Sequence, residues 1–302
     1  MTLLRELQAD DVRRRCQGPG LNLQIGPFST RVRSRFHDVQ AYLQSHYADF
    51  PVSEGPGCHF SIAVASPAGL RRWVRPQAMF FIDGKPPFNP VPRRLAPPLF
   101  EWGLNWCIGR RAHHWLMLHS SVVERGGHVL LMPAPPNSGK STLGASLAFG
   151  GWRLFSDEFG LIDPQTGLLH PLPRPIALKN ESIEIIRARV PGVRYGPVAE
   201  NEDGEVAVHA APPADAVARL QEPAPVSWIV VPRFQRDSEV NLETIPKARM
   251  LAHLSDSSFN YNVVPGGFEA LARIVDGAQC FKLTFGRLQD ALVALGRLIP
   301  ER

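Results

Sequence analysis

Residues 128–151 read HVLLMPAPPNSGKSTLGASLAFGG, and this stretch decides which fold the sequence predicts. An apolar strand runs into a loop of small residues, then into GKST at 139–142, and then into an amphipathic helix. In that order, the backbone N–H groups of the loop surround a phosphate with donors, and the positive end of the helix dipole faces it. We therefore interpret the stretch as a phosphate-binding loop (P-loop) rather than as a chance SGKST in a surface loop.

Each residue of this loop has an expected task. Gly139 lets the backbone approach the phosphate because no side chain stands in the way. Lys140 is expected to reach the β- and γ-phosphates of ATP, and the Ser141 hydroxyl is expected to ligate Mg²⁺. Thr142 starts the helix close to the α-phosphate. The predicted nucleotide-binding residues are Asn137, Ser138, Gly139, Lys140, Ser141 and Thr142.

The beginning of the loop departs from the pattern G-x-x-x-x-G-K-[ST]. Ala134 stands where the first glycine is expected, and Pro135 and Pro136 follow it. A methyl group is a small steric change, but the two prolines remove two N–H donors. The loop is therefore expected to be stiff and to donate through residues 137–139.

Phosphoryl transfer also needs carboxylates, one for Mg²⁺ and one that takes the proton of the acceptor. The next predicted strand ends in the adjacent acids Asp157 and Glu158. In a parallel sheet such strand ends share an edge with the phosphate loop, so we expect the pair in the site, with a solvated turn as the alternative. His119 opens the strand before the P-loop strand, and its imidazole is expected near the γ-phosphate unless it is an ordinary strand-end residue.

Outside this stretch, the patterns predict an α/β protein with two regions. Residues 1–98 are expected to form a smaller β-rich N-terminal region, and residues 99–302 the P-loop domain. The proline-rich residues 85–98 are expected to be a linker, a wrapping arm or an ordered surface loop. Strands are expected at 21–26, 30–36, 59–65, 78–83, 119–124, 128–134, 152–163, 170–178, 226–234 and 279–285, and helices at 39–47, 99–118, 140–149, 181–190, 245–255, 267–275 and 288–298.

Composition limits the class of protein. Among 302 residues, 44% are hydrophobic and 20% charged, as in soluble globular proteins. The formal charge of +5 either favours anionic partners such as nucleotides, acidic peptides or nucleic acid, or serves solubility. Nucleic acid is the weaker idea, because no aromatic–basic array accompanies the charge. The four cysteines have spacings that suggest neither a zinc site nor a disulfide scaffold.

The expected location is the cytoplasm. The N-terminal segment MTLLRELQADDVRRRC is polar and charged, and it lacks the apolar region of a secretory signal. The longest apolar stretches are far shorter than a membrane span, so we expect no membrane partner.

The motifs, in this order, resemble those of the HPr kinase/phosphorylase family. The family shows a His at a strand start, a hairpin, the P-loop, a small-residue turn and an aliphatic strand that closes in an acidic pair. Here these features are His119, residues 139–142, residues 150–154, and Asp157 with Glu158. The fragments EWGLNW, PNSGKSTL, GWRLFSDE, PLPRPIALKN and SFNYN are similar to the branch called HPr kinase-related kinase A. The family resemblance covers residues 117–190, and the branch resemblance extends over nearly the whole chain.

This resemblance implies a P-loop kinase domain with a mixed sheet, of the type that HPr kinases and phosphoenolpyruvate carboxykinases share. It implies a kinase that uses ATP and Mg²⁺ to phosphorylate a serine hydroxyl, with Asp157 as the proton acceptor and Glu158 as a metal helper. HPr kinases have a second aspartate at the position of Glu158, and their RG-x-G stretch is replaced here by RPIALKN. In that replacement, Arg174 and Lys179 are cations that can steady phosphate charge during transfer, with a basic surface strand as the alternative. Because HPr kinases form rings, the resemblance also favours a homo-oligomer.

Three functions remain open at this stage. The favoured one is a kinase that phosphorylates a serine of a protein or peptide. The second is a small-molecule kinase that acts on free serine or a sugar alcohol. The third is a regulator that binds ATP and a partner without transferring phosphate, which the two loop prolines and the Asp-Glu pair allow.

Overall fold

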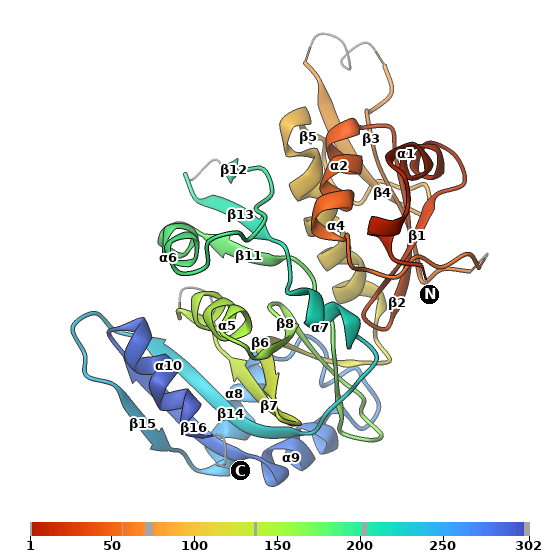
Figure 1. The fold of residues 1–302 in the computed structure, drawn as a ribbon. Coiled ribbons are helices and arrows are strands. Elements are labelled where there is room, and N and C mark those ends of the chain that lie inside the picture. The colour runs from red at the N-terminus through yellow and green to blue at the C-terminus, as the bar shows by residue number, and fades with distance from the viewer. Residues whose placement is uncertain (1, 56, 70–74, 136–137, 201–203, 299–302) are drawn as a thin grey trace. The chain divides into compact units, whose positions relative to one another are not determined.

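The fold is taken from a computed structural model that describes residues 2–55, 57–69, 75–135, 138–200 and 204–298. The chain forms two compact units, each of which mixes helices with sheets (Figure 1). Unit 1 comprises Met1–Arg111, Ala177–Ile183 and Gly192–Ala218, and unit 2 comprises Ala112–Ile176, Glu184–Pro191 and Arg219–Arg302. The predicted α/β class with mixed sheets is confirmed. The expected regions meet at one boundary, between residues 98 and 99. The two units have several boundaries, because the chain passes from one unit to the other several times.

Unit 1 contains a five-stranded sheet in the order β1-β2-β3-β4-β5. Its strands are β1 (Leu21–Ile25), β2 (Phe28–Ser34), β3 (Phe60–Ala65), β4 (Gln77–Ile82) and β5 (Val91–Pro92). β2 and β3 are parallel, and the other neighbours are antiparallel. Every second residue of β2 and β3 is buried, because side chains alternate between a covered face and an open face.

Three helices pack against this sheet, and two short 3-10 helices precede the first and the last of them. The helices are α1 (Ala9–Gln17), α2 (His37–His46), α4 (Ala96–Arg111), and the 3-10 turns η1 (Leu4–Glu6) and η2 (Arg93–Leu95). The start of α4 corrects the prediction of a linker or loop that continues to residue 98. Pro97 and Pro98 lie in the first turn of α4, where the missing N–H groups would have no helical partner anyway.

The predicted helix over residues 99–118 is wrong at its end. α4 stops at Arg111, and Leu116 begins strand β6 (Leu116–Arg125). Leu116 and Leu118 are fully buried and pair with residues of strand β9 (Phe159–Ile162). The spacing of the apolar residues is only a local signal for a helix. Pairing with β9 outweighs it at residues 116–118.

Unit 2 is built on a mixed sheet with the order β10-β9-β6-β7-β14-β16-β15, and β8 also pairs with β6. Besides β6 and β9, its strands are β7 (His128–Pro133), β8 (Arg153–Ser156), β10 (Leu169–His170), β14 (Val226–Phe234), β15 (Asn241–Thr244) and β16 (Gln279–Phe285). β7, β14 and β16 are parallel, whereas β6 is antiparallel to both β7 and β8. β7 and β8 therefore run in the same direction and end at the same edge of the sheet.

Helices cover both faces of this sheet (Figure 1). They are α5 (Lys140–Phe149), α8 (Lys247–Ser257), α9 (Gly267–Gly277) and α10 (Leu288–Gly296). Leu131 of β7 shares a buried cluster with Leu254 of α8 and Leu271 of α9. Its neighbour Met132 points to the opposite face and pairs with Ser121 of β6, on which α5 packs.

A third sheet is formed by β11 (Ile176–Lys179), β12 (Ala199–Glu200) and β13 (Val206–Ala210), and helices α6 (Glu181–Arg189) and α7 (Ala214–Ala218) lie nearby in the chain. The predicted strand over 170–178 is two strands, β10 and β11. Pro171, Pro173 and Pro175 separate them, because each lacks the N–H that a sheet ladder uses. In the described part of the chain, none of the helices combines the length and the apolar character that a bilayer span requires.

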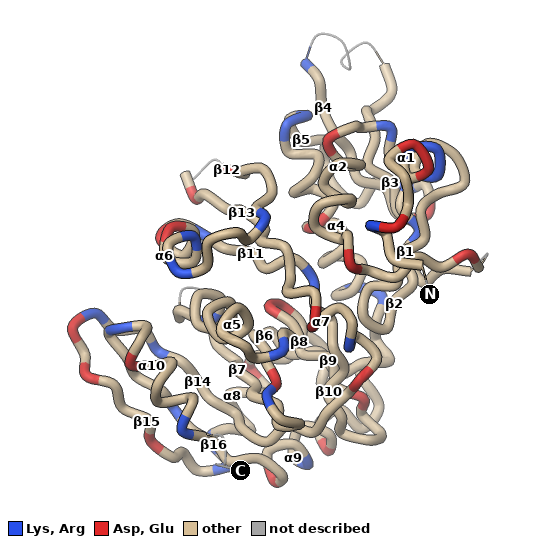
Figure 2. The backbone as a smooth tube through the Cα atoms, viewed as in Figure 1, with Lys and Arg blue, Asp and Glu red and all other residues tan. Residues whose placement is uncertain are grey.

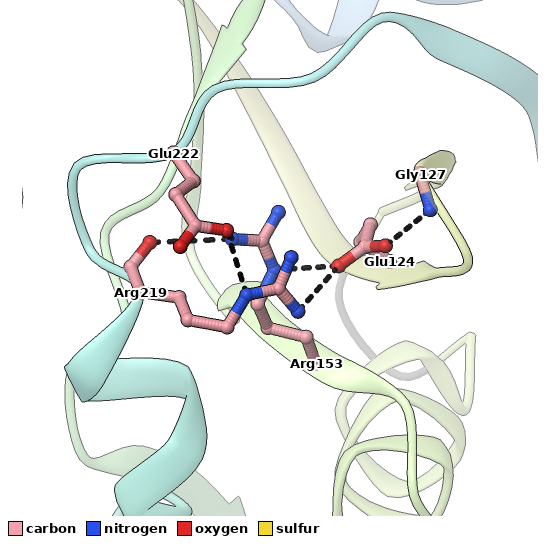
Figure 3. A network of polar contacts seen from close by, with 5 residues as sticks. All are labelled: Glu124, Gly127, Arg153, Arg219 and Glu222. Atoms are coloured by element: carbon pink, nitrogen blue, oxygen red, sulfur yellow. Dashed lines mark hydrogen bonds and ion pairs between the residues drawn. The ribbon is translucent and has the colours of Figure 1, made fainter.

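A buried ion pair joins β6 and β8 near the last residues of β6 (Figure 3). Glu124 Oε2 lies 2.6 Å from Arg153 Nε, and the two side chains are 2% and 4% exposed. The contact is an ion pair between two buried side chains. Glu124 also accepts a 2.6 Å hydrogen bond from the Gly127 N–H, and Arg219 and Glu222 extend the network outward.

Candidate active site

The predicted P-loop ends at Gly139, which lies directly before α5. Its backbone is left-handed, with φ of 85°, which a glycine adopts without strain. A Cβ at this position would lie 3.2 Å from Phe285 Cζ, so the surroundings also disfavour a side chain. The Phe234 N–H donates to Ser138 O at 3.1 Å, which ties the loop to the end of β14.

The first turn of α5 presents backbone donors at the end of the loop. The Leu143 N–H donates to Gly139 O at 3.0 Å, so the helix is regular from its start. The N–H groups of Lys140, Ser141 and Thr142 precede this bond and have no acceptor within the helix. Together with the positive end of the helix dipole, they form an arrangement that binds anions. Ser138 lies beside them, and Asn137 falls outside the described residues.

Lys140 carries a buried cation at this helix start. Only 6% of the residue is exposed, and Nζ lies 3.4 Å from Ala134 O. Burial lowers the pKa of the ammonium group, whereas the charges of Asp157 and Glu158 raise it. The contact with Ala134 is long, and its acceptor is an uncharged carbonyl oxygen. The ammonium group therefore still has N–H donors available for an anionic ligand.

Asp157 follows β8 and is 9% exposed. Burial raises the pKa of its carboxyl group to about 7. The charge of Lys140 and the nearby hydroxyls of Ser121 and Ser141 lower this pKa, and the charge of Glu158 raises it. Within the described residues, the buried Oδ1 accepts no well-aligned hydrogen bond. An oxygen with no such bond can accept a hydrogen bond or a cation that a ligand brings.

Ser121 and Gly144 are part of this site, although the sequence analysis did not single them out. Ser121 is buried on β6, two residues after His119. A Cβ at Gly144 would lie 2.0 Å from Ser121 Oγ and 3.8 Å from Asp157 Oδ1. Gly144 therefore allows α5 to approach the strand that carries Ser121. The sequence does hold a signal for both residues. Gly144 lies one helical turn after Lys140, and Ser121 lies on the same strand face as His119, two residues later.

His119 and Glu158 lie together on the more open side of the site. His119 Nε2 is 3.6 Å from Glu158 Oε1, and both side chains are partly exposed. Burial and the charge of Lys140 lower the pKa of the imidazole, while Glu158 raises it. The exposed ring of Phe259 lies 5.9 Å from the His119 ring and 5.2 Å from the Phe159 ring. The open side thus combines an imidazole, a carboxylate and an aromatic face.

The turn that carries the two acids is held by Ser156. Its Oγ accepts hydrogen bonds from the backbone N–H groups of Glu158 at 3.3 Å and Phe159 at 3.1 Å. The Ser120 N–H donates to Glu158 O at 3.2 Å, which ties the turn to β6. These bonds fix the positions of both carboxylates relative to the strand that carries His119.

Asn260, in the SFNYN stretch, has a structural task. It is buried, its Oδ1 accepts from the Met117 N–H at 2.9 Å, and its Nδ2 donates to Trp115 O at 2.8 Å. The side chain thus braces the start of β6.

Lys179 belongs to unit 1, whereas the other described candidate residues belong to unit 2. Its Nζ lies 3.0 Å from Glu205 Oε2, also in unit 1, and its backbone N–H donates to Ser182 Oγ at 2.7 Å. Unit 2 therefore assembles His119, Lys140, Asp157 and Glu158 without Lys179. Arg174, the other cation of that stretch, is buried in unit 2.

The residues present fit a magnesium ion that is bound together with phosphate. In the described part of the chain, no group of three or more His, Cys, Asp or Glu side chains is placed to hold a metal ion by itself. Mg²⁺ usually takes one or two carboxylates and completes its shell with water and substrate phosphates. The Ser141 hydroxyl, the carboxylate of Glu158 and the unpartnered Oδ1 of Asp157 are suitable oxygen donors.

Comparison with models of known protein families gives no match, and comparison with curated proteins gives none either.

Proposed function

We propose that the protein is an ATP-dependent kinase, a phosphotransferase with an alcohol group as acceptor, and that this acceptor is a serine hydroxyl of a protein or peptide. The observation that carries the proposal is the carboxyl group of Asp157. It is buried beside Lys140 and a left-handed glycine loop, and its pKa is raised to about 7. A general base works best when its pKa lies near the working pH, and the buried carboxyl of Asp157 meets that condition.

In this proposal, backbone donors of the loop and of the first turn of α5 bind the phosphates. Lys140 neutralises charge on the γ-phosphate. The acceptor oxygen attacks the γ-phosphorus while its proton passes to Asp157, the bond from that phosphorus to the bridging oxygen breaks, and ADP leaves. Mg²⁺, held by Ser141 and Glu158, would neutralise charge on the β- and γ-phosphates.

Two further features support a hydroxyl acceptor. His119, whose pKa is lowered, is neutral at pH 7 and can exchange hydrogen bonds with a phosphate or a hydroxyl beside Glu158. The resemblance to the HPr kinase/phosphorylase family adds the preference for serine. Because Asp157 must be ionised to accept the proton, transfer is expected to slow as the pH falls below about 7.

The test follows labelled phosphate from ATP with Mg²⁺ and lysate of the native cell, separated into a protein fraction and a small-molecule fraction. Lys140→Ala removes the phosphate-binding cation, and Lys282→Ala serves as the control because Lys282 forms an exposed ion pair with Glu243. We expect label on serine in the protein fraction with the wild type and Lys282→Ala. With Lys140→Ala, we expect a loss of about two orders of magnitude or more.

Asp157→Asn separates catalysis from binding. If this variant binds ATP as the wild type does and transfers no phosphate, Asp157 is the base and the regulator interpretation fails. Label that appears only in the small-molecule fraction would assign the enzyme a free metabolite as substrate. ATP binding without transfer or hydrolysis in both fractions would overturn the kinase proposal and leave a nucleotide-dependent regulator.

A further inference from the structure

Unit 1 carries a basic cavity that the proposed kinase chemistry does not use. It has a volume of about 600 Å³ and is broadly open to solvent. Three arginines line it: Arg15 from the last turn of α1, and Arg31 and Arg33 from alternate positions on β2. Because Arg31 and Arg33 are two residues apart, both lie on the uncovered face of the strand. Across the neighbouring strand β1, Asn22 Oδ1 accepts a 3.0 Å hydrogen bond from Arg31 Nε.

Arg33 is held in place by neutral groups. Its guanidinium donates to Pro19 O at 2.9 Å, to Ser61 Oγ at 3.3 Å and to Gly18 O at 3.4 Å. Among the described residues it forms no ion pair. The positive charge is therefore fixed in position at the cavity wall without a carboxylate to neutralise it, which favours an incoming anion.

The neighbouring arginines of α1 are different. Helix α1 displays charges of both signs (Figure 2), and Arg13 and Arg14 pair with Asp10 and Asp11 one turn earlier. In the cavity itself, Arg15 NH2 lies 3.3 Å from Glu54 Oε1, and the Glu54 side chain is 81% exposed. This weak surface pair places the carboxylate of Glu54 against the arginines of the cavity. A carboxylate of a bound peptide can contact them in the same way.

The chemistry of the wall favours a peptide carboxylate over a phosphate dianion. Carbonyl oxygens of Gly18 and Pro19 follow the C-terminal end of α1, which is the negative end of its dipole, and a dianion is repelled there more than a monoanion. A peptide also brings N–H groups that can donate to such carbonyls, whereas phosphate dianion brings only acceptors.

We propose that this cavity binds an acidic peptide segment, with two or more Asp or Glu side chains received by Arg15, Arg31 and Arg33. The site lies within unit 1, and binding there does not depend on phosphoryl transfer. It gives unit 1 a task in recognising a partner protein by charge.

The test measures the fluorescence anisotropy of a labelled eight-residue Glu/Gly peptide with the full-length protein, beside a matched Gln/Gly peptide. Arg33→Met and Arg15→Met are the test variants. Arg35→Met is the control, because Arg35 is an exposed arginine just after β2 and outside the cavity lining. We expect the acidic peptide alone to bind, roughly tenfold weaker binding for each test variant, and unchanged binding for the control. Raising the salt from 50 to 200 mM should weaken the binding, as expected for exposed charges.

Several outcomes would overturn the proposal. Equal affinity for both peptides, or an equal loss in Arg35→Met, would show general surface attraction. Inorganic phosphate that binds through Arg33 while the acidic peptide does not would assign the cavity to phosphate. Arg15→Met keeps the test meaningful if Arg33→Met is misfolded, because the Arg15 side chain is 29% exposed and its ion-pair partner Glu54 is 81% exposed.

Discussion

At the scale of single residues, Asp157 links the candidate site to stability. Its folded pKa of about 7 lies above the ordinary value of 3.8, so the folded protein holds this proton more tightly than the unfolded chain. The contribution of Asp157 to the free energy of unfolding is therefore fully present below a pH of 3.8. It is lost as the pH rises from there toward 7. Asp157→Asn should be more stable than the wild type at pH 8, by up to about 4 kcal/mol at ~1.4 kcal/mol per pKa unit.

Urea unfolding at pH 5 and pH 8 checks this prediction. The advantage of Asp157→Asn should grow between the two pH values, because the carboxyl of the unfolded wild type is ionised there while that of the folded protein keeps its proton up to a pH of about 7. A variant of equal or lower stability at pH 8 would mean that Asp157 ionises without cost in the folded state.

Gly144 offers a second test at this scale. In Gly144→Ala, the gain in helix propensity and the steric overlap with Ser121 change the free energy of unfolding in opposite directions. Glycine to alanine within a helix normally stabilises by about 1 kcal/mol. Here the added Cβ would lie 2.0 Å from Ser121 Oγ, so α5 or β6 must shift. We expect Gly144→Ala to lower the free energy of unfolding by about 1–3 kcal/mol and to weaken ATP binding. Adding Ser121→Ala should restore part of both losses, because it removes the clashing oxygen; additive losses would contradict this packing.

At the scale of elements, the Glu124–Arg153 pair (Figure 3) joins β6 to β8 near the last residue of β6, at the end of the strand away from His119. Glu124→Gln leaves a buried guanidinium without its closest counter-charge, so unfolding free energy should fall by about 3–5 kcal/mol. Glu222→Gln is the matched control, since Glu222 is half exposed and its loss should cost less than about 1 kcal/mol. Chemical denaturation measures the free energy of unfolding of both variants. Equal losses in the two would show that burial does not strengthen the Glu124–Arg153 pair.

At the scale of the whole molecule, nucleotide binding should stabilise the folded state. MgATP at one hundred times its dissociation constant is expected to add about 2.7 kcal/mol, or a Tm rise of several degrees. Lys140→Ala should remove the rise, and EDTA should reduce it, because Mg²⁺ neutralises phosphate charge beside the two acids. Thermal unfolding with ATP, Mg²⁺ and EDTA measures this, and a rise that persists in Lys140→Ala would place the nucleotide elsewhere.

The local patterns of the sequence determined much of the architecture by themselves. The strand, loop and helix over residues 128–149 follow from apolar periodicity and from Gly139, whose left-handed backbone suits glycine. Alternating residues likewise identified β1, β2 and β3, because one face of that sheet is covered. These features depend on neighbours within a few residues, which periodicity can detect.

Only the tertiary structure decided the rest. Residues 116–118 have a helical spacing, yet they pair with β9, and the short strands β12 and β15 have no apolar pattern of their own. The surroundings of Asp157 come from β6, α5 and the turn after β8, and the pKa of its carboxyl depends on burial among them. Segments distant in the chain meet only in the folded sheet, which is why the sequence analysis named the acid but not the serine and the glycine beside it.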